Sequence, residues 1–402
     1  MKILHTADWH LGKVFEHSQV NFSLLEEQRR ILEKIVKIAD EERVDVVVIA
    51  GDIFDSYNPP NEARLLFNET ITELSKKGER PVIIISGNHD SPEGLATIKP
   101  LTANHGIIIH HLPVSTEERH LRGKNFEVEI KGNWLKLEKG GESAIFFLLP
   151  FVSESRLNEA FIGDNLLDKT LSYNEKIEKL ISKEPPFDGD TRILVSHIFI
   201  DSGVEAGSEK KLILGSSYLF ESSRIPESFD LVLLGHLHKS QRIGERIFYS
   251  GSIFPMNLAE IERSPAKYVS IFEPEKAGFS YEEIEILPGD YVRLWEFEDL
   301  ESALREIENL KTSLVYIKIK RPLTNHETLV ELRRALRENL LGITFEVPEL
   351  VEGDYFEKTD LESLTDEELF REFYRHQMGK DPDGRLVEVF IRILNEVRHE
   401  AH

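Results

Sequence analysis

The stretch VDVVVIAGDIFD, residues 44–55, is an apolar run that ends at a glycine and two aspartates. Such a run is typical of a strand buried on both faces of a sheet. The glycine lets the backbone turn sharply off the strand, so Asp52 and Asp55 follow its carboxyl end. Ligands of α/β sheets gather at these ends. The stretch therefore predicts a layered fold and the place of a functional site.

Four other apolar segments end in similar residues. Aspartate, asparagine and histidine offer the oxygen and imidazole ligands that metal ions take in proteins. Residues two apart in an extended chain point the same way, so an Asp-x-His or His-x-His pair can aim at one spot. The four clusters are Asp8-Trp9-His10 after a strand at Ile3 and Leu4, Gly87-Asn88-His89-Asp90 after residues 81–85, His197 after residues 192–195, and Gly235-His236-Leu237-His238 after residues 231–234.

Helical segments alternate with these strands. Apolar residues recur with helical spacing over residues 24–39 and 63–74. Strand, helix and strand joined by short connections predict an α/β layered core. We assign this core to residues 1–275, in which the five strand-end motifs can meet in one crevice.

The pattern changes after residue 275. Residues 276–347 predict a small α+β domain. In it we expect strands at 281–287 and 292–297 to pair around the turn Pro288-Gly289-Asp290. Helices are expected at 299–310 and 327–338, and further strands at 314–319 and 343–347.

Residues 348–402 predict a helical tail, acidic in its first half. Thr365 to Glu368 fit a capping box that opens one helix. A last helix carries an apolar stripe on one side, formed by Leu386, Phe390, Ile393 and Val397. The stripe predicts packing against this chain's own body or against a partner.

Composition excludes several classes of protein. The 402 residues contain no cysteine, which excludes disulfides, thiolate metal sites and cysteine nucleophiles. No apolar run approaches the ~20 residues of a membrane span. The start, MKILHTAD, predicts a strand and no secretory signal, so we expect a cytoplasmic protein that does not act on membranes. The net charge of −23 argues against nucleic-acid binding through bulk charge alone.

The number of candidate ligands indicates two metal ions. One tetrahedral ion would use four ligands at most and would leave the others as buried polar groups without a partner. Two ions that share one carboxylate fit better. The mixed nitrogen and oxygen donors suit Mn²⁺, Fe or Zn²⁺. The seven candidates are Asp8, His10, Asp52, Asn88, His197, His236 and His238.

In these motifs the sequence resembles the calcineurin-like metallophosphoesterases. More narrowly, residues 7–12, 51–55 and 87–91 (ADWHLG, GDIFD and GNHDS) resemble the SbcD nuclease subunits of bacterial SbcCD complexes, which are related to archaeal and eukaryotic double-strand-break repair nucleases. The resemblance implies a four-layer α/β/β/α sandwich with a small capping domain and a helical tail. It also implies a Mn²⁺-dependent DNA exonuclease and endonuclease that acts in DNA repair and hairpin processing.

The resemblance also implies a role for each site residue. Asp8, His10, Asp52 and His238 would hold one ion, and Asp52, Asn88, His197 and His236 the other. His89 would face the scissile phosphate and stabilise or protonate the leaving oxygen. Asp90 would orient His89 or only cap the following turn. Asp55 stands where the archaeal and eukaryotic relatives have histidine, which leaves its role open, and Gly251-Ser252-Ile253 replaces the common Gly-Ser-Pro.

The partners that the resemblance implies are DNA, an SbcC-type SMC-like ATPase docked on the tail, and a second copy of the chain bound through helices of the first domain. Basic residues that could meet DNA, or form an ordinary solvated surface, are Arg119, Arg122, Lys124, Lys210, Lys211, Lys239 and Arg242. Two alternatives remain at this point: a metallophosphoesterase acting on nucleotides or phosphoproteins, and a non-catalytic scaffold.

Overall fold

The computed structural model describes residues 1–17, 20–102, 105–154, 156–157, 171–189, 191–207, 219–275, 278–321, 325–345, 365–378 and 381–400. Its contacts divide the chain into two units, residues 1–346 and residues 347–402. None of the helices in the described residues combines the length and apolar character needed to cross a membrane.

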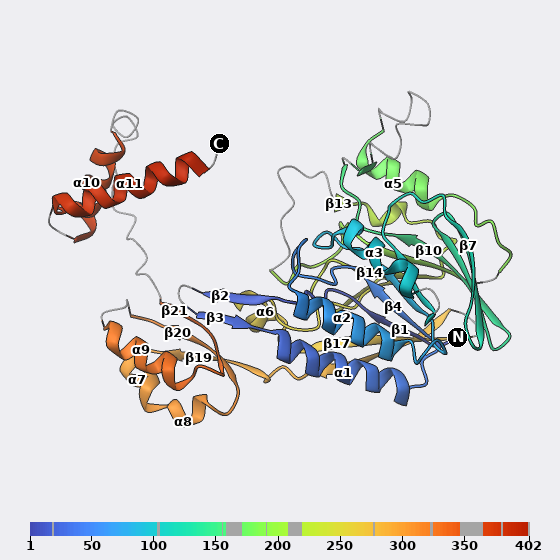
Figure 1. Cartoon of the computed structure of the whole chain (residues 1–402), viewed down its shortest axis with the longest axis horizontal. Helices are drawn as coiled ribbons and strands as arrows, with labels where there is room; N and C mark the ends of the chain where they lie inside the picture. Colours follow the sequence, from blue (N-terminus) through green and yellow to red (C-terminus); the bar gives the residue numbers. More distant parts are fainter. Residues whose placement is uncertain are drawn as a thin grey trace. The chain divides into compact units, whose positions relative to one another are not determined.

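The first sheet of unit 1 has six strands, and four neighbouring strands from its middle to one edge run parallel. β1, β4, β5 and β6 are joined in parallel, and β17 and β18 add to β1 in antiparallel fashion. In spatial order the strands are β18 (Phe279–Leu287), β17 (Lys267–Pro274), β1 (Ile3–Thr6), β4 (Val46–Ala50), β5 (Val82–Ile85) and β6 (Ile107–His110) (Figure 1).

The second sheet has eight strands and is half parallel and half antiparallel. The parallel half joins β10, β11, β14 and β16. In spatial order the strands are β15 (Gln241–Ile243), β16 (Ile247–Tyr249), β14 (Leu231–Gly235), β11 (Arg192–His197), β10 (Glu142–Leu149), β9 (Trp134–Lys139), β8 (Phe126–Lys131) and β7 (Glu118–Arg122). A two-stranded pair, β12 (Phe199–Ile200) and β13 (Leu219–Phe220), and the short helix η3 (Ser222–Arg224) accompany it.

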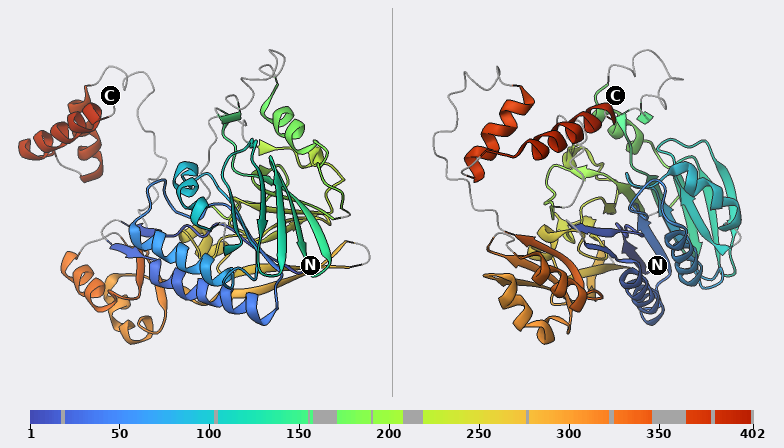
Figure 2. Two further views of the ribbon diagram at one scale, coloured as in Figure 1. Left: turned by 45° about the vertical axis from the view of Figure 1, so that its right-hand side comes forward. Right: turned by 60° about the vertical axis from the view of Figure 1, so that its left-hand side comes forward.

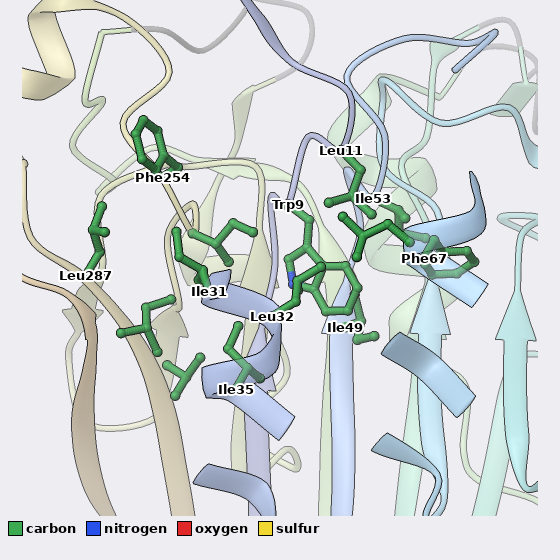
Figure 3. Packing of buried hydrophobic residues seen from close by; sticks show 14 of the residues in the cluster. Trp9, Leu11, Ile31, Leu32, Ile35, Ile49, Ile53, Phe67, Phe254 and Leu287 are labelled. Atoms are coloured by element: carbon green, nitrogen blue, oxygen red, sulfur yellow. The ribbon is translucent and has the colours of Figure 1, made fainter. Parts of the chain in front are cut away.

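The two sheets stack, and helices cover their outer faces. Alternate residues of β4 show this arrangement, because Val47 and Ile49 pack with α1 (Leu25–Glu41) and α2 (Asn61–Leu74), whereas Val46 and Val48 face the eight-stranded sheet. In Figure 3, Ile31, Leu32 and Ile35 of α1 lie beside Trp9 and Ile49.

The outer face of the eight-stranded sheet packs against α5 (Tyr173–Ile181), and α3 (Pro92–Thr102) lies beside β6. Figure 2 shows α1 and α2 in blue and α5 in green on opposite sides of the sheets. The predicted four-layer α/β/β/α fold is therefore confirmed.

A smaller layer of unit 1 follows β18. Its three parallel strands are β19 (Val292–Phe297), β20 (Leu314–Ile319) and β21 (Leu340–Phe345), with the helices α7 (Leu300–Arg305), α8 (Ile307–Leu310) and α9 (His326–Ala335). It has its own apolar core, which includes Ile317 and Leu332. A hairpin that sequence reasoning did not find, β2 (Val14–His17) and β3 (Val20–Ser23), lies beside β21 (Figure 1).

The predicted pairing of strands 281–287 and 292–297 is wrong. β18 pairs instead with β17, the strand just before it, and thereby extends the six-stranded sheet. Gly278, at φ +86°, precedes β18 in this connection, and its carbonyl accepts a hydrogen bond from the Glu275 N–H at 3.0 Å. The links 275–278 and 288–291 are equally long, so loop length does not decide between the two pairings; β18 joins β17 at the edge of the six-stranded sheet, and β19 pairs with β20 instead.

Unit 2 is a helical hairpin of α10 (Asp366–Met378) and α11 (Gly384–Glu400). The predicted capping box is confirmed: the Thr365 N–H donates to the Glu368 carboxylate, and the Glu368 N–H donates to Thr365 Oγ1. Phe370 and Phe390 stack with ring centroids 4.1 Å apart. The side chains of Ile393 and Val397, half of the predicted stripe, lie outside the described residues.

Candidate metal centre

The five predicted motifs meet where strand ends of both stacked sheets come together. β1, β4 and β5 of the six-stranded sheet carry three motifs, and β11 and β14 of the eight-stranded sheet carry two. Backbone bonds join neighbouring motifs: the Asp8 N–H donates to the Gly51 carbonyl and the His10 N–H to the Asp52 carbonyl, both at 3.0 Å. The crevice therefore lies between two sheets, not along the edge of one.

Four of the predicted ligands have strained backbones. Asp8, His10, Asp52 and His236 have φ angles of 52°, 45°, 49° and 98°, in the left-handed region that non-glycine residues rarely adopt. Only three other non-glycine residues in the described part of the chain do so. Strain of this kind persists where the surrounding structure enforces it, and it is concentrated at functional sites.

One set of ligands, which we name the first ligand group, consists of Asp8, His10 and His238. Ligand atoms of all three lie within 4.8 Å of one another, and all three residues are buried. The Nε2 atoms of His10 and His238 are 3.1 Å apart. Two neutral imidazole nitrogens that both present lone pairs repel each other at this distance unless a proton or a cation lies between them.

The second ligand group consists of Asn88, His197 and His236. Its ring nitrogens converge on one oxygen, because Asn88 Oδ1 lies 3.0 Å from His197 Nε2 and 2.9 Å from His236 Nδ1. Asp8 accepts the backbone N–H of His236 at 3.0 Å, which fixes the loop that carries this ring.

Asp52 lies between the two groups. Its Oδ2 is 3.6 Å from His10 Nε2 and 3.5 Å from His197 Nε2. Its Oδ1 accepts the backbone N–H of His89 at 2.8 Å. Glycine is required beside it, since a Cβ built on Gly87 would overlap this carboxylate. One buried carboxylate is thus within reach of both sets of imidazoles.

The donor set fits divalent metal ions. Asp8, Asp52 and His197 form a further group with ligand atoms within 4.8 Å. The seven predicted ligands therefore form overlapping clusters of nitrogen and oxygen donors, six of them buried and Asn88 half-buried, and none contains sulfur. Such a set suits Mn²⁺, Fe or Zn²⁺.

Burial and charge shift the pKa values in this centre in opposite directions. Burial raises the pKa of Asp8 to about 7. It lowers the pKa of His10 to about 4 and that of His236 to about 3. Burial opposes charge on Asp52 and His197 too, but their mutual attraction outweighs it: the pKa of Asp52 is lowered and that of His197 is raised to about 9. Without metal, these two groups therefore form an ion pair.

His89 lies at the same crevice, with a ligand atom within 4.8 Å of those of His10 and Asp52. Its ring is held by the backbone, because Nδ1 lies 2.7 Å from the carbonyl oxygen of Asp55 and must donate to it. The remaining nitrogen, Nε2, is the one available to a substrate. The ring of His10 is 4.6 Å away, centroid to centroid.

The orienting role that we expected for Asp90 is not what the structure shows. Its carboxylate accepts the backbone N–H groups of Gly87, Ile53 and Phe54 at 2.8, 3.2 and 3.0 Å. These bonds tie the loops after β4 and β5 together. The carboxylate is thus committed to donors that do not belong to the turn after it, so neither of the two roles considered for it is seen, and the Asp55 carbonyl contacts the ring of His89 instead.

Sequence reasoning missed the buried side chains that support the ligands. Gln28 of α1 donates to the carbonyls of Trp9 and His10 at 3.0 and 2.7 Å and accepts the Gly12 N–H at 3.1 Å. Its signal was a polar residue inside the apolar stripe of a helix. Glu260 and Lys267, which contact His238, carried no recognisable pattern.

A cleft of about 800 Å³ opens beside this centre. It lies between the loop after β1, the residues near Asp55, the segment 256–262 and β20 of the smaller layer. Lys13, Tyr316 and Lys318 are among its lining residues. Lys13 is 3.2 Å from the Asp55 carboxylate, which in turn lies 3.4 Å from His10 Nδ1.

The basic residues proposed for DNA contact are largely paired with acids. Arg122 is 2.7 Å from Glu127, and Lys124 is 2.9 Å from Glu79. Arg119 lies 3.8 Å from Glu117. Arg242 donates to the carbonyls of residues 244 and 245. Lys210 and Lys211 lie outside the described residues.

Comparison with known proteins identifies the family of the chain. The family model of the calcineurin-like phosphoesterases matches residues 1–240. The SbcD subunit of the SbcCD nuclease of Bacillus subtilis is 31% identical over 411 residues, which cover 100% of this chain and 99% of that protein. The SbcD subunit of Staphylococcus epidermidis is 34% identical over 267 residues, 66% of this chain and 64% of that protein.

Solved structures of phosphoesterases resemble the chain more distantly. The calcineurin-like phosphoesterase YfkN from Bacillus subtilis covers 84% of this chain and 96% of its own, with 13% identity and a TM-score of 0.35. From the family match and the full-length similarity to an SbcD protein, this chain belongs to the calcineurin-like phosphoesterases, in the branch of the SbcD nuclease subunits.

Proposed function

We propose that this chain hydrolyses DNA phosphodiester bonds with two divalent ions, for which Mn²⁺ is the best candidate. The observation that supports this most strongly is the position of the Asp52 carboxylate, about equally distant from His10 and His197 of the two ligand groups. The first ion would be held by Asp8, His10, Asp52 and His238. The second would be held by Asp52, Asn88, His197 and His236.

When bound, two such ions neutralise the phosphodiester, lower the pKa of a water and align its attack. The protein's contribution is to hold seven donors in place before the substrate arrives. His89 acts on the substrate itself. Its Nδ1–H is committed to the Asp55 carbonyl, so Nε2 is the atom that would stabilise or protonate the leaving oxygen, and it has a proton to donate only when the ring is an imidazolium ion. Asp90 keeps the His89 loop against the β4 loop through its backbone bonds.

DNA as substrate is inferred from the SbcD relatives, whose names describe nucleases. The cleft beside Asp55 offers space for a strand next to the ions. We propose that residues 276–347 act as a cap over this cleft, since β20 contributes Tyr316 and Lys318 to its wall. With a net charge of −23, tight binding of DNA by this chain alone is not expected.

The partner that we propose is an SbcC-type ATPase, in line with the SbcCD complex for which the relatives are named. The helical hairpin of unit 2 offers apolar side chains for such docking. Leu369, Phe373 and Leu386 are 42%, 58% and 38% exposed. A homodimer through helices of the first domain is proposed as well, and exposed Leu65 of α2 and Leu101 of α3 would suit it.

The test compares substrates in Mn²⁺. Purified chain, with and without the ATPase partner, is given single-stranded DNA, hairpin DNA and small phosphodiesters, including nucleotides. Cleavage of DNA well above that of the small esters is expected. Equal or faster hydrolysis of the nucleotides or other small phosphodiesters would replace the nuclease assignment with the alternative phosphoesterase. A variant ending at residue 349 should keep the metal-dependent hydrolysis and lose association with the ATPase, and unchanged association would refute docking on the tail.

A further inference from the structure

A buried network of side chains lies behind the metal ligand His238. His238 Nδ1 is 2.8 Å from Glu260 Oε1, on α6 (Leu258–Arg263). The other oxygen of Glu260 accepts from Lys267 Nζ at 2.7 Å and from Ser252 Oγ at 3.2 Å. Glu260 is 0% exposed and Lys267 2% exposed. A carboxylate and an ammonium are thus enclosed together behind one imidazole.

Such a network is costly, and stability alone does not explain it. Removing two charges from water is unfavourable, and a buried ion pair is often no more stable than apolar side chains of similar volume. Lys267 Nζ also donates to Ser252 Oγ at 2.8 Å and to the His238 carbonyl at 3.2 Å. Apart from the ion pair between Glu260 and Lys267, each of these hydrogen bonds joins one of the two side chains to His238 or to Ser252. Ser252 Oγ in turn lies 3.4 Å from the His238 carbonyl.

The geometry determines which nitrogen of His238 can bind metal. A carboxylate only accepts, so Nδ1 must carry the proton that it shares with Glu260. Nε2 is then the atom with the lone pair, and it is the atom that lies 3.1 Å from His10 Nε2 in the first ligand group. The network therefore selects the tautomer of His238 and fixes its ring toward the first ion.

The two other histidines that would share an ion with Asn88 are supported differently. His197 Nδ1 donates to the backbone carbonyl of Ala50 at 2.8 Å, which is a neutral partner. His236 turns its Nδ1 to Asn88. A carboxylate partner raises the basicity of a metal-bound imidazole more than a carbonyl does, and such partners commonly change metal affinity 10–100-fold.

We propose that Glu260 is a positioning residue for the first ion, acting through His238, and that Lys267 is its fixed counter-ion. Glu260 orients the ring and strengthens Nε2 as a ligand. Lys267 balances the buried charge, so the carboxylate stays in place before metal arrives. The proposal rests on the two-ion centre proposed above.

The decisive variant is Glu260→Gln, which keeps the shape of the side chain but leaves one acceptor oxygen for the three donors that the carboxylate now serves. Mn²⁺ is titrated into the metal-free full-length chain, and free Mn²⁺ is followed by electron paramagnetic resonance. Thermal unfolding is measured in EDTA and in Mn²⁺. Glu262→Gln is the matched control for metal binding, because it makes the same change on α6 at a side chain that pairs with Lys318 in the wall of the cleft instead of with a predicted metal ligand.

We expect Glu260→Gln to weaken one of the two Mn²⁺ sites 10–100-fold and to reduce the rise in melting temperature that Mn²⁺ produces. If Glu260 had a purely structural role, Glu260→Gln would lower the melting temperature in EDTA, and Mn²⁺ would still raise the melting temperature by the same amount as in the natural chain. Glu262→Gln should bind both ions with unchanged affinity. A folded Glu260→Gln variant that binds both ions as tightly as the natural chain would overturn the proposal.

A second variant covers the case in which Glu260→Gln does not fold. The double variant Glu260→Gln with Lys267→Met removes both charges, so no unpaired ion stays buried. It should fold and still show the weakened site, and two sites of natural affinity in it would overturn the proposal. If the natural chain itself does not bind two Mn²⁺ ions, the proposed two-ion centre is refuted. That result differs from one in which the natural chain binds two ions and the Glu260 variants bind them equally tightly, which would refute only the role of Glu260.

Discussion

The two ligand groups are built from the same kinds of residue but are supported in different ways. In the first group, Gln28 binds the loop of His10 and Glu260 binds the ring of His238, so buried side chains hold it. In the second group, the backbone carbonyl of Ala50 holds His197, and the strand pairing of β11 with β14 sets its position. The second group is thus fixed by the fold itself, whereas single side chains outside the ligand set can adjust the first.

The largest effect is expected where the groups meet. Asp52→Ala removes the carboxylate that both groups share, so both ions should be lost and hydrolysis should fall below detection. Metal analysis of the dialysed variant, beside a nuclease assay in Mn²⁺, measures this. A variant that still binds two equivalents of Mn²⁺ would show that each ligand group holds its ion without Asp52. The bridging role of Asp52 would then be disproved.

His89→Gln should leave both ligand groups intact, because His89 is not among the seven ligands. We expect normal Mn²⁺ binding and a loss of turnover of about 10²–10⁴-fold, the usual contribution of a positioned acid. Single-turnover cleavage of DNA by the metal-loaded variant gives the rate. Retained activity in a variant with full metal content would remove His89 from the chemistry.

The two ions should respond to pH in different ranges. His197 of the second group has a pKa raised to about 9 in the metal-free chain, so an ion must displace its proton at neutral pH. The affinity of the second site should therefore fall about tenfold for each pH unit below 9. In the first group, burial raises the pKa of Asp8 to about 7, and His10 titrates only near 4.

Between pH 7 and pH 9 only the second site should change its affinity, and below pH 7 both should weaken. Mn²⁺ titrations at pH 6, 7, 8 and 9, followed through free Mn²⁺, measure the two constants. Two sites that weaken in parallel over the whole range would show that the groups do not differ in this way.

The smallest effect is expected for Gln28→Leu, which removes support from the first group only. Burying the carbonyls of Trp9 and His10 without their donor should cost about 1–3 kcal/mol in the free energy of unfolding. Urea denaturation in EDTA gives this value. The Mn²⁺ affinity of the first site should fall while that of the second stays constant, and a uniform decrease in both would argue against separate supports.

The strand-end motifs could be predicted because their chemistry is local. The sequence Gly51-Asp52 after residues 44–50 shows the buried strand, the turn and the ligand in one stretch. The same holds for Gly87-Asn88 and for His236 and His238. All seven predicted ligands meet in the structure, although they come from two stacked sheets rather than from one sheet edge.

The supports could not be predicted because they depend on tertiary packing. Glu260 lies in a six-residue helix, and nothing in its neighbours indicates that it faces His238. Asp90 follows His89 directly in the sequence, yet its carboxylate accepts hydrogen bonds from backbone N–H groups of the loop after β4. The pairing of β18 was missed because Pro288-Gly289-Asp290 and the turn at Gly278 both suit a hairpin, and only the sheet decides between them.

A crystal structure of the chain soaked in Mn²⁺, with anomalous diffraction recorded at the manganese edge, tests the central claim most directly. We expect two peaks about 3.5–4 Å apart, one between Asp8, His10 and His238, the other between Asn88, His197 and His236, and both in contact with Asp52. A single peak, or peaks that do not share the Asp52 carboxylate, would contradict the two-ion centre.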